Sequence, residues 1–377
     1  MHKLSHHIFL ILLSFSFTAH AQPSFDNQAS YGYRKAPGAV LLPASKSPSP
    51  LDRSNPDSAE TSDGQLKSVI DRIMGAERAR ILMGSIDRKV VLERYAQDWL
   101  RDTTPLGYSM SKSLVALTVG HAACNGKLNL NQKGEEVAPK LAGTSWGNAT
   151  IKQILNMRSG SAILDPAKAG WKTDALGWHH QQIYKGSLST DYYDMLRKED
   201  EQKFPPGESF QYNNLDTLAL TLIVQAAVNR SFSDYFQEMI WQPVQSTHAG
   251  AWLQNTHGQT AGATGFSAAP EDWIRLGHYV LDQHAKSDTC FGKFLHEATG
   301  PISRSYIPSR CYGYQMWNWC DKSSFMFFGY AGQYLIMNPA KKVVLYAHQG
   351  SHAGDAVVVD AYRRLLASAP ELRNKTR

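Results

Sequence analysis

The chain has 377 residues, of which 42% are hydrophobic, and its formal net charge is +6. This composition provides ample apolar material for a large core, and the length allows one to three domains, among which we expect one large bilobed unit. The four cysteines lack zinc-ligand spacing and the paired histidines lack an HExxH context. The sequence therefore predicts no metal centre.

Residues 1–21 have the order of a secretory signal peptide. A basic start precedes the apolar run IFLILLSFSF, and Ala19-His20-Ala21 supplies the small-x-small pattern that precedes cleavage. We therefore expect cleavage after Ala21 and a periplasmic or secreted protein. The apolar run is too short for a permanent span, so the protein is not expected to span a membrane. Export argues against a nucleic-acid partner and favours attraction of the positive charge to an anionic envelope surface, and the alternative is a solvated charged face with no specific partner.

The segments after residue 21 differ in their predicted structure along the chain. Residues 22–64 are rich in Ser, Pro, Asp and Asn and poor in large apolar side chains, which predicts a disordered linker. Apolar residues at helical spacing begin near Leu66, and the runs RILMGSI and KVVLERYA then predict a β-hairpin that turns at Asp87-Arg88. From about 104 to 285 the pattern is mostly helical.

Strand patterns return near the C-terminus in GYQMWNW, FMFFGY, QYLIMNP and KVVLYAHQ, and the amphipathic run DAVVVDAYRRLLAS predicts a last helix. Strands at both ends with helices between them predict an α+β fold. We expect an antiparallel sheet built from both chain ends, flanked by helices, with an inserted mostly helical region.

An oxidising compartment permits disulfides among the four cysteines. Cys124 lies in an apolar run, so we interpret it as a buried small hydrophobic residue. Cys290, Cys311 and Cys320 lie nearer to one another in the sequence, and the pattern favours one bridge among these three.

The segment SMSK places Ser109 three residues before Lys112 at the start of an apolar run. Residues i and i+3 share one face of a helix, so the two side chains can meet if a helix starts at Ser109. Backbone N–H groups at a helix start are unpaired and can receive a developing oxyanion. A poorly solvated lysine can accept a proton near neutral pH. Ser109 is thus a candidate nucleophile with Lys112 as its base, and the alternative is two polar residues at the start of an ordinary buried helix.

A second candidate pair, Tyr212 and Asn214, follows the turn Pro205-Pro206-Gly207 and precedes another apolar helix. A tyrosine beside a lysine can act as a base or proton relay, because the cation favours the phenolate. The asparagine amide can hold the lysine or the acyl amide of a substrate. The alternative for Tyr212 is a half-buried aromatic residue with a bonded hydroxyl.

In this order, Ser-x-x-Lys and Tyr-x-Asn resemble the first two motifs of the serine β-lactamase and penicillin-binding-protein superfamily, in its class C branch. The similarity runs from about Arg80 to Leu365 and includes GKLNLNQKGEEVAPKL, ATIKQILNMRSGSAILD and ATGFSAAPEDWIRLGHYVL. The resemblance implies a single β-lactamase-like serine hydrolase domain over 65–377 that needs no metal or organic cofactor.

The third motif, Lys-Thr-Gly or a substitute in the family, is replaced here by GYAGQ, and no cationic side chain occurs from residue 325 to 339. In the β-lactam-recognising relatives that cation helps to bind the substrate carboxylate, so its absence argues against an antibiotic hydrolase. GYAGQ resembles the form found in family VIII carboxylesterases and 6-aminohexanoate-dimer hydrolase. Besides Asn214, the residues expected to contact the substrate or its oxyanion are Gly329, Tyr330, Ala331 and Gly332.

A backbone N–H near Ala331 or Gly332 could complete an oxyanion hole with that of Ser109. The glycines at 329 and 332 could equally mark a tight hairpin bend, and both interpretations can hold together.

The sequence thus predicts a serine hydrolase that acts through a covalent acyl-enzyme on ester or amide bonds of small substrates, like the carboxylesterase and 6-aminohexanoate-oligomer-hydrolase relatives. Ser109 would attack, Lys112 and Tyr212 would take its proton, and water would hydrolyse the acyl-enzyme. Two alternatives remain. One is a β-lactamase or a peptidoglycan D-amino-acid peptidase acting on cell-wall fragments, and the other is a catalytically silent envelope-binding protein.

Overall fold

The computed structural model describes residues 38–59, 64–75, 79–97, 99–162, 189–305, 309–350 and 355–370. The expected signal peptide at 1–21 lies outside these residues. Within the described ranges, no helix combines the length and the apolar character that crossing a membrane requires.

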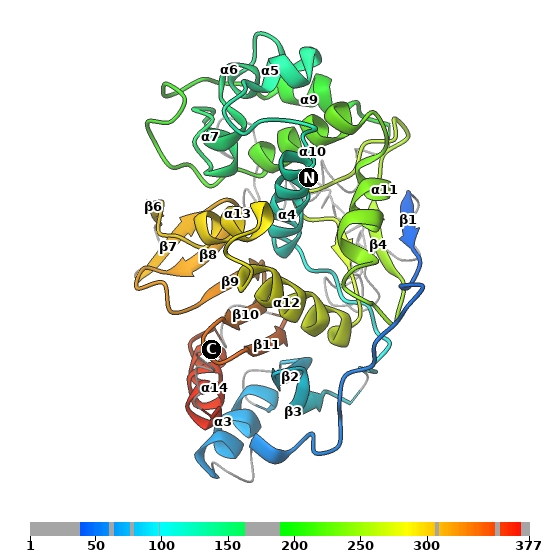
Figure 1. Ribbon diagram of the computed structural model, residues 1–377, viewed down its shortest axis with the longest axis vertical. Helices are drawn as coiled ribbons and strands as arrows, with labels where there is room; N and C mark the ends of the chain where they lie inside the picture. Colours follow the sequence, from blue (N-terminus) through cyan, green and yellow to red (C-terminus); the bar gives the residue numbers. More distant parts are fainter. Residues whose placement is uncertain are drawn as a thin grey trace, which may run out of the picture.

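A large antiparallel sheet joins the two ends of the chain (Figure 1). The described residues give it eight strands in the order β3-β2-β11-β10-β9-β8-β7-β6. Their bounds are β2 (Ile81–Ile86), β3 (Lys89–Tyr95), β6 (Ser303–Arg304), β7 (Arg310–Gly313), β8 (Met316–Trp319), β9 (Phe325–Gly329), β10 (Gln333–Asn338) and β11 (Val343–His348). β2 pairs with β11, with Ile81 opposite His348. The α+β prediction of a sheet built from both chain ends is confirmed.

The hairpin between β2 and β3 turns at Asp87 and Arg88, which have φ values of 47° and 68°. Two successive left-handed residues form the kind of two-residue turn whose twist matches the twist of the flanking strands. The predicted hairpin and its turn are therefore confirmed.

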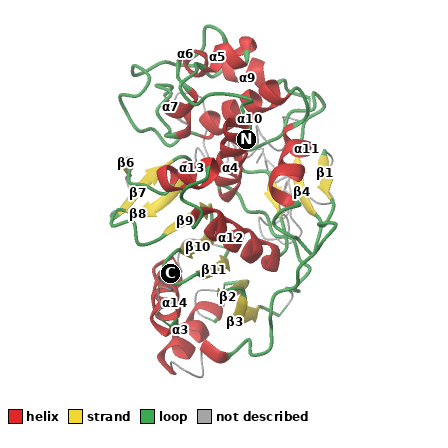
Figure 2. Cartoon of the chain, viewed as in Figure 1, coloured by secondary structure: helices red, strands yellow, loops and turns green. Residues whose placement is uncertain are grey.

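Helices cover both faces of the large sheet (Figure 2). α12 (Pro270–His284) packs on β2, β10 and β11, and α3 (Gly64–Met74) packs beside α14 (Asp355–Ser368), which contacts β11. Successive side chains of a strand point to opposite faces. On β11, Val344 and Tyr346 accordingly join one apolar core, whereas Val343 and Leu345 join the other.

The region inserted between the sheet strands is mostly helical, as predicted. Its bounds are α4 (Met110–Cys124), α5 (Gly134–Val137), the 3-10 helix η1 (Pro139–Leu141), α6 (Ser145–Asn148), α7 (Ile151–Leu155), α9 (Tyr192–Lys198), α10 (Asn214–Val228), α11 (Phe232–Phe236) and the π-helical turn η2 (Gln237–Trp241); α13 (Cys290–Ala298) follows α12. α4 packs against α10, α13 and β9. Because α4 is apolar on nearly every side, it lies buried at the junction of the helical region and the sheet.

A second, three-stranded sheet forms from β1 (Ala39–Leu42), β4 (Gly250–Leu253) and β5 (Phe266–Ser267). β1 pairs with β4, with Ala39 opposite Leu253. The prediction of a disordered linker over 22–64 does not hold for this stretch. The short run AVLL adds to the edge of β4, and β-strand pairing can order a segment that could not fold alone.

Two disulfides connect the four cysteines, Cys124 with Cys290 and Cys311 with Cys320. The interpretation of Cys124 as an unpaired hydrophobic residue is wrong, because the packing of α13 on α4 brings the two helix ends to a Cα–Cα distance of 5.7 Å. The second bridge, within the β7–β8 hairpin, confirms one disulfide among the other three cysteines.

The two disulfides should contribute unequally to stability. They close loops with sequence separations of 166 and 9 residues, and chain-entropy arguments give about 5 kcal/mol for the longer loop and about 2.5 kcal/mol for the shorter one. We expect Cys124→Ala/Cys290→Ala to lower the free energy of unfolding more than Cys311→Ala/Cys320→Ala in urea titrations. The opposite order would show that the α4–α13 bridge does not restrict the unfolded chain.

Candidate functional site

Ser109 is the N-cap residue of α4, and its side chain makes no capping hydrogen bond. The hydroxyl instead lies 2.9 Å from the Lys112 amine, one helical turn along. The expectation that a helix begins at Ser109 and brings these two side chains together is therefore met. Tyr108, directly before the serine, has a φ of 47°, a costly conformation for a bulky residue that marks a sharp turn into the helix.

Lys112 is buried, with 1% of its surface exposed. Besides Ser109, its Nζ contacts the carbonyl oxygen of Ala263 at 2.9 Å. Burial lowers the pKa of this amine to about 7, because removal from water penalises the charged form. A neutral amine can keep one N–H on the Ala263 carbonyl and offer its lone pair to the hydroxyl proton. Ala263 was not predicted as a site residue, since a backbone carbonyl leaves no signal in the sequence.

Tyr212 lies beside the amine, with its ring centroid 5.3 Å from Lys112 Nζ. The ring is half-buried and packs against Tyr312 and Trp317, at centroid distances of 5.9 and 5.3 Å. The structure thus brings together Ser109, Lys112 and Tyr212. The half-buried position of the ring also agrees with the alternative interpretation, which did not anticipate the cluster of aromatic rings around it.

Asn214 is the first residue of α10, a helix that packs against α4, and it is buried. Two residues later, the carboxylate of Asp216 accepts hydrogen bonds from Ser159 Oγ at 2.6 Å and Trp146 Nε1 at 2.8 Å. Burial raises the pKa of Asp216 to about 7, although both hydrogen bonds oppose this shift. Asp216 therefore connects the loop at Ser159, which follows α7, to the start of α10. The sequence analysis did not predict this role.

The third motif forms the turn between β9 and β10. Gly329 pairs with Gln333, so residues 330–332 make the bend. Ala331 and Gly332 have φ values of 60° and 80°, so the bend uses left-handed backbone as the hairpin interpretation expected.

The turn lies against the start of α4. A Cβ atom at Gly329 would lie 2.4 Å from the Gly107 carbonyl oxygen, so only glycine allows this approach of the two backbones. The ring of Tyr330 meets that of Tyr108 edge to face, with centroids 6.0 Å apart. Gly329 and Tyr330 therefore contact Gly107 and Tyr108, the two residues that precede Ser109.

Two backbone N–H groups at this junction are available. Within the described ranges, neither the N–H of Ser109 nor that of Gly332 donates a hydrogen bond to another part of the chain. Unpaired donors beside a nucleophile can receive a developing negative charge. These are the two donors that the oxyanion hole expected from the sequence would use.

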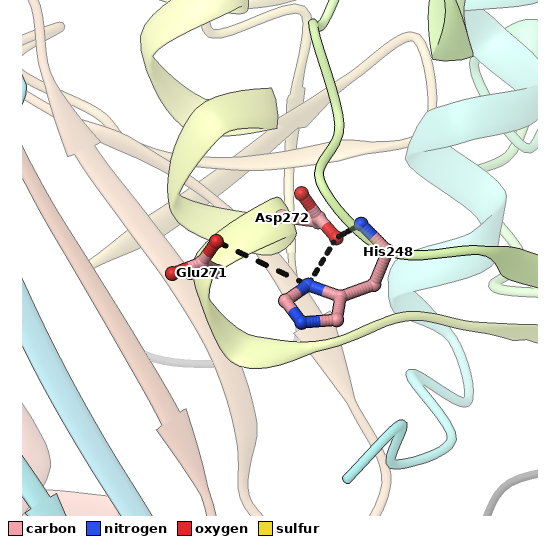
Figure 3. Close-up of side chains that lie close together, drawn as sticks. All are labelled: His248, Glu271 and Asp272. Carbon is pink, nitrogen blue, oxygen red and sulfur yellow. Dashed lines mark hydrogen bonds and ion pairs between the residues drawn. The ribbon is translucent and has the colours of Figure 1, made fainter. Parts of the chain in front are cut away.

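A separate cluster of His248, Glu271 and Asp272 has the composition of a metal site (Figure 3). Its carboxylates are already neutralised, because Arg275 pairs with Glu271 at 2.7 Å and with Asp272 at 2.8 Å, and Arg53 also pairs with Glu271. A divalent cation would have to displace or face two guanidinium groups. We assign the cluster as an ion-pair network that ties Arg53, in the N-terminal segment, to α12.

Comparison with known proteins gives three related findings. A family model described as "Beta-lactamase" matches residues 69–369. The 6-aminohexanoate-dimer hydrolase of Paenarthrobacter ureafaciens is 25% identical over 207 residues, which cover 54% of this chain and 51% of that relative. The chain therefore spans about half the length of this curated relative.

Solved structures show the same fold. A Bacillus anthracis protein assigned provisionally as a 6-aminohexanoate-dimer hydrolase superposes with a TM-score of 0.76 at 17% identity, covering 92% of this chain and 94% of that one. A class C β-lactamase gives a TM-score of 0.63 at 15% identity, covering 85% of this chain and all of the other. The resemblance stated from the sequence and the β-lactamase/transpeptidase-like fold are confirmed.

The lowered pKa of Lys112 predicts a pH-dependent stability. In the unfolded chain this amine binds a proton below about pH 10.5, whereas in the folded protein it does so only below about pH 7. Between these values the unfolded state binds more protons, so the free energy of unfolding should rise with pH by up to about 1.4 kcal/mol per unit. Urea titrations from pH 7 to 10 should show this rise for the unaltered protein relative to Lys112→Met.

The matched control is Lys67→Met, which removes a lysine that is 61% exposed and paired with Asp71 on α3. Its stability difference from the unaltered protein should stay flat over the same range. Equal pH profiles for the two variants would mean that Lys112 keeps an ordinary pKa.

Proposed function

Because the chain belongs to the β-lactamase family, we propose that it is a serine hydrolase that acts through a covalent acyl-enzyme on ester or amide bonds of small substrates. The observation that carries this proposal is the buried Lys112 amine 2.9 Å from the Ser109 hydroxyl. An amine that is partly neutral at pH 7 is matched to accept a proton at that pH.

In the proposed reaction, Lys112 takes the hydroxyl proton while Ser109 Oγ forms a bond to the carbonyl carbon. The N–H groups of Ser109 and the 330–332 turn receive the negative charge on the carbonyl oxygen. The proton is then delivered to the departing alcohol or amine, with Tyr212 as a relay between Lys112 and the leaving group. A water molecule repeats the sequence on the acyl-enzyme and releases the acid.

The proposed substrate is a small ester or linear amide of the carboxylesterase or 6-aminohexanoate-oligomer type. Two features support this choice. The third-motif turn carries no cation and so does not require a carboxylate on the substrate, and aromatic rings of Tyr108, Tyr212 and Tyr330 surround the start of α4. The similarity to 6-aminohexanoate-dimer hydrolase also supports an ester or linear amide as the substrate.

We also propose that the protein acts in the periplasm or outside the cell, after cleavage of residues 1–21. Its four cysteines all form disulfides in the structure, and disulfides persist in oxidising compartments. Mass spectrometry of protein recovered from the periplasm and the culture medium should show a chain that begins at Gln22.

The function is tested with p-nitrophenyl butyrate, a 6-aminohexanoate dimer and a chromogenic cephalosporin. We expect turnover of the ester or the amide, and we expect Ser109→Ala to abolish it because the nucleophile is lost. Lys112→Met and Tyr212→Phe should each lower kcat by about 100-fold or more if both transfer protons. The acidic limb of kcat/KM should lie near pH 7, where Lys112 becomes protonated.

The matched control is Ser113→Ala, because Ser113 is another buried serine of α4 whose hydroxyl bonds the Gln315 carbonyl. This variant should retain activity. Turnover that survives Ser109→Ala would overturn the assignment of the nucleophile. No turnover and no fluorophosphonate adduct would favour the envelope-binding alternative, and cleavage of muropeptides alone would favour a cell-wall peptidase.

A further inference from the structure

Two buried glutamines lie behind the third-motif turn. Gln333 is the first residue of β10, and Gln349 directly follows β11, the neighbouring strand. Each side chain is 1% exposed. Their amide oxygens have no hydrogen-bond partner within the described ranges. Burying an unpaired acceptor is costly, so the amide N–H groups of these residues must make contacts that offset this cost.

Those amide groups hold the two carbonyls of the turn. Gln333 Nε2 donates to Ala331 O at 3.2 Å and to Gln349 O at 2.8 Å. Gln349 Nε2 donates in return to Gly332 O, at the longer distance of 3.4 Å. The two glutamine side chains thus hold the turn and also connect the start of β10 to the end of β11. We call Gln333 and Gln349 the glutamine clamp.

The clamp fixes the direction of the N–H groups of the turn. A trans peptide group is planar, and its C=O and N–H point to opposite sides; no peptide bond among the described residues is cis. Holding Ala331 O therefore directs the N–H of Gly332 away from the glutamines, and holding Gly332 O does the same for the N–H of Gln333. Among the described residues, the Gly332 N–H donates no hydrogen bond.

The turn needs such support, because Ala331 adopts a left-handed conformation with a φ of 60°. For a residue with a Cβ atom this conformation is sterically unfavourable. Without the hydrogen bond to the Ala331 carbonyl, the 331–332 peptide group could rotate, and the Gly332 N–H would then point in another direction. A preorganised donor stabilises charge without reorganising during the reaction, so fixing the peptide planes has a direct kinetic value.

We propose that Gln333 and Gln349 are positioning residues that aim a backbone N–H of the 330–332 turn at the oxyanion formed beside Ser109. The inference rests on the proposed function. It adds two residues that touch neither the nucleophile nor the base. They act through the backbone alone and bring no charge to the site.

The test removes the amide donors in Gln333→Met and Gln349→Met. We expect kcat with p-nitrophenyl butyrate to fall about 10- to 100-fold, less than the loss from deleting an oxyanion donor itself, while KM changes less than about threefold. Affinity for phenylboronic acid, which forms a tetrahedral adduct with an active serine, should fall in parallel with kcat. Affinity for butyrate, a planar product, should stay unchanged. A structural defect would not separate the two ligands.

Asn338→Leu is the matched control. Asn338 is a buried amide at the opposite end of β10, where its Nδ2 donates to the Ser323 carbonyl at 2.8 Å. It should lower thermal stability and leave kcat and boronate affinity unchanged. If a Met variant does not fold, Gln333→Leu or Gln349→Leu removes the same amide donors with a smaller side chain and gives the same comparison.

Three outcomes would overturn the clamp. The first is an equal loss of boronate and butyrate affinity in the glutamine variants, the second is a kinetic profile equal to that of Asn338→Leu, and the third is an unchanged kcat. In each case the unaltered protein reacts and Ser109→Ala does not, so the proposed function stands. If the unaltered protein neither turns over the ester nor reacts with a fluorophosphonate, the proposed function itself fails and the clamp falls with it.

Discussion

The site depends on one amine that is kept out of water. An exposed lysine would be charged at pH 7 and could only donate to Ser109, which would leave the hydroxyl intact. Lys112 is surrounded by the packed residues of α4 and its neighbours, so its charged form is penalised and its pKa falls to about 7. The Ala263 carbonyl supplies an acceptor for one N–H. The apolar helix therefore sets the chemistry of the site as well as the core packing.

Two distant parts of the chain meet at the start of this helix. Tyr212 comes from the helical region, two residues before α10, and Asp216 anchors the start of α10 to the loop at Ser159. The β9–β10 turn arrives from the large sheet, where the contact of Gly329 with the Gly107 backbone fixes its approach. A sheet built from both chain ends and a helical insertion can each carry part of the site, because both pack on α4.

Local patterns predicted much of this arrangement. The spacing of Ser109 and Lys112, the hairpin at Asp87-Arg88 and the alternation of the C-terminal strands depend on a few neighbouring residues. The pairing of Cys124 with Cys290 depends on how two helices pack, and the pairing of β1 with β4 joins segments that are distant in the sequence, with Ala39 opposite Leu253. Neither leaves a local signal. Backbone groups such as the Ala263 carbonyl, and buried amides such as Gln349, are likewise identified only once the chain is folded.

The third-motif turn separates two tasks that a cation would combine. A cation at this place can bind a charge that a substrate already carries, which lowers the energy of the bound substrate as well as that of the transition state. A backbone N–H aimed at the carbonyl oxygen binds a charge that develops only during the reaction, and such binding raises kcat. This chain has no Lys, Arg or His from residue 325 to 339, yet it holds the turn with neutral glutamine amides. In the proposed reaction the turn would therefore support the chemical step without selecting for an anionic group on the substrate, which suits the small esters and linear amides proposed above.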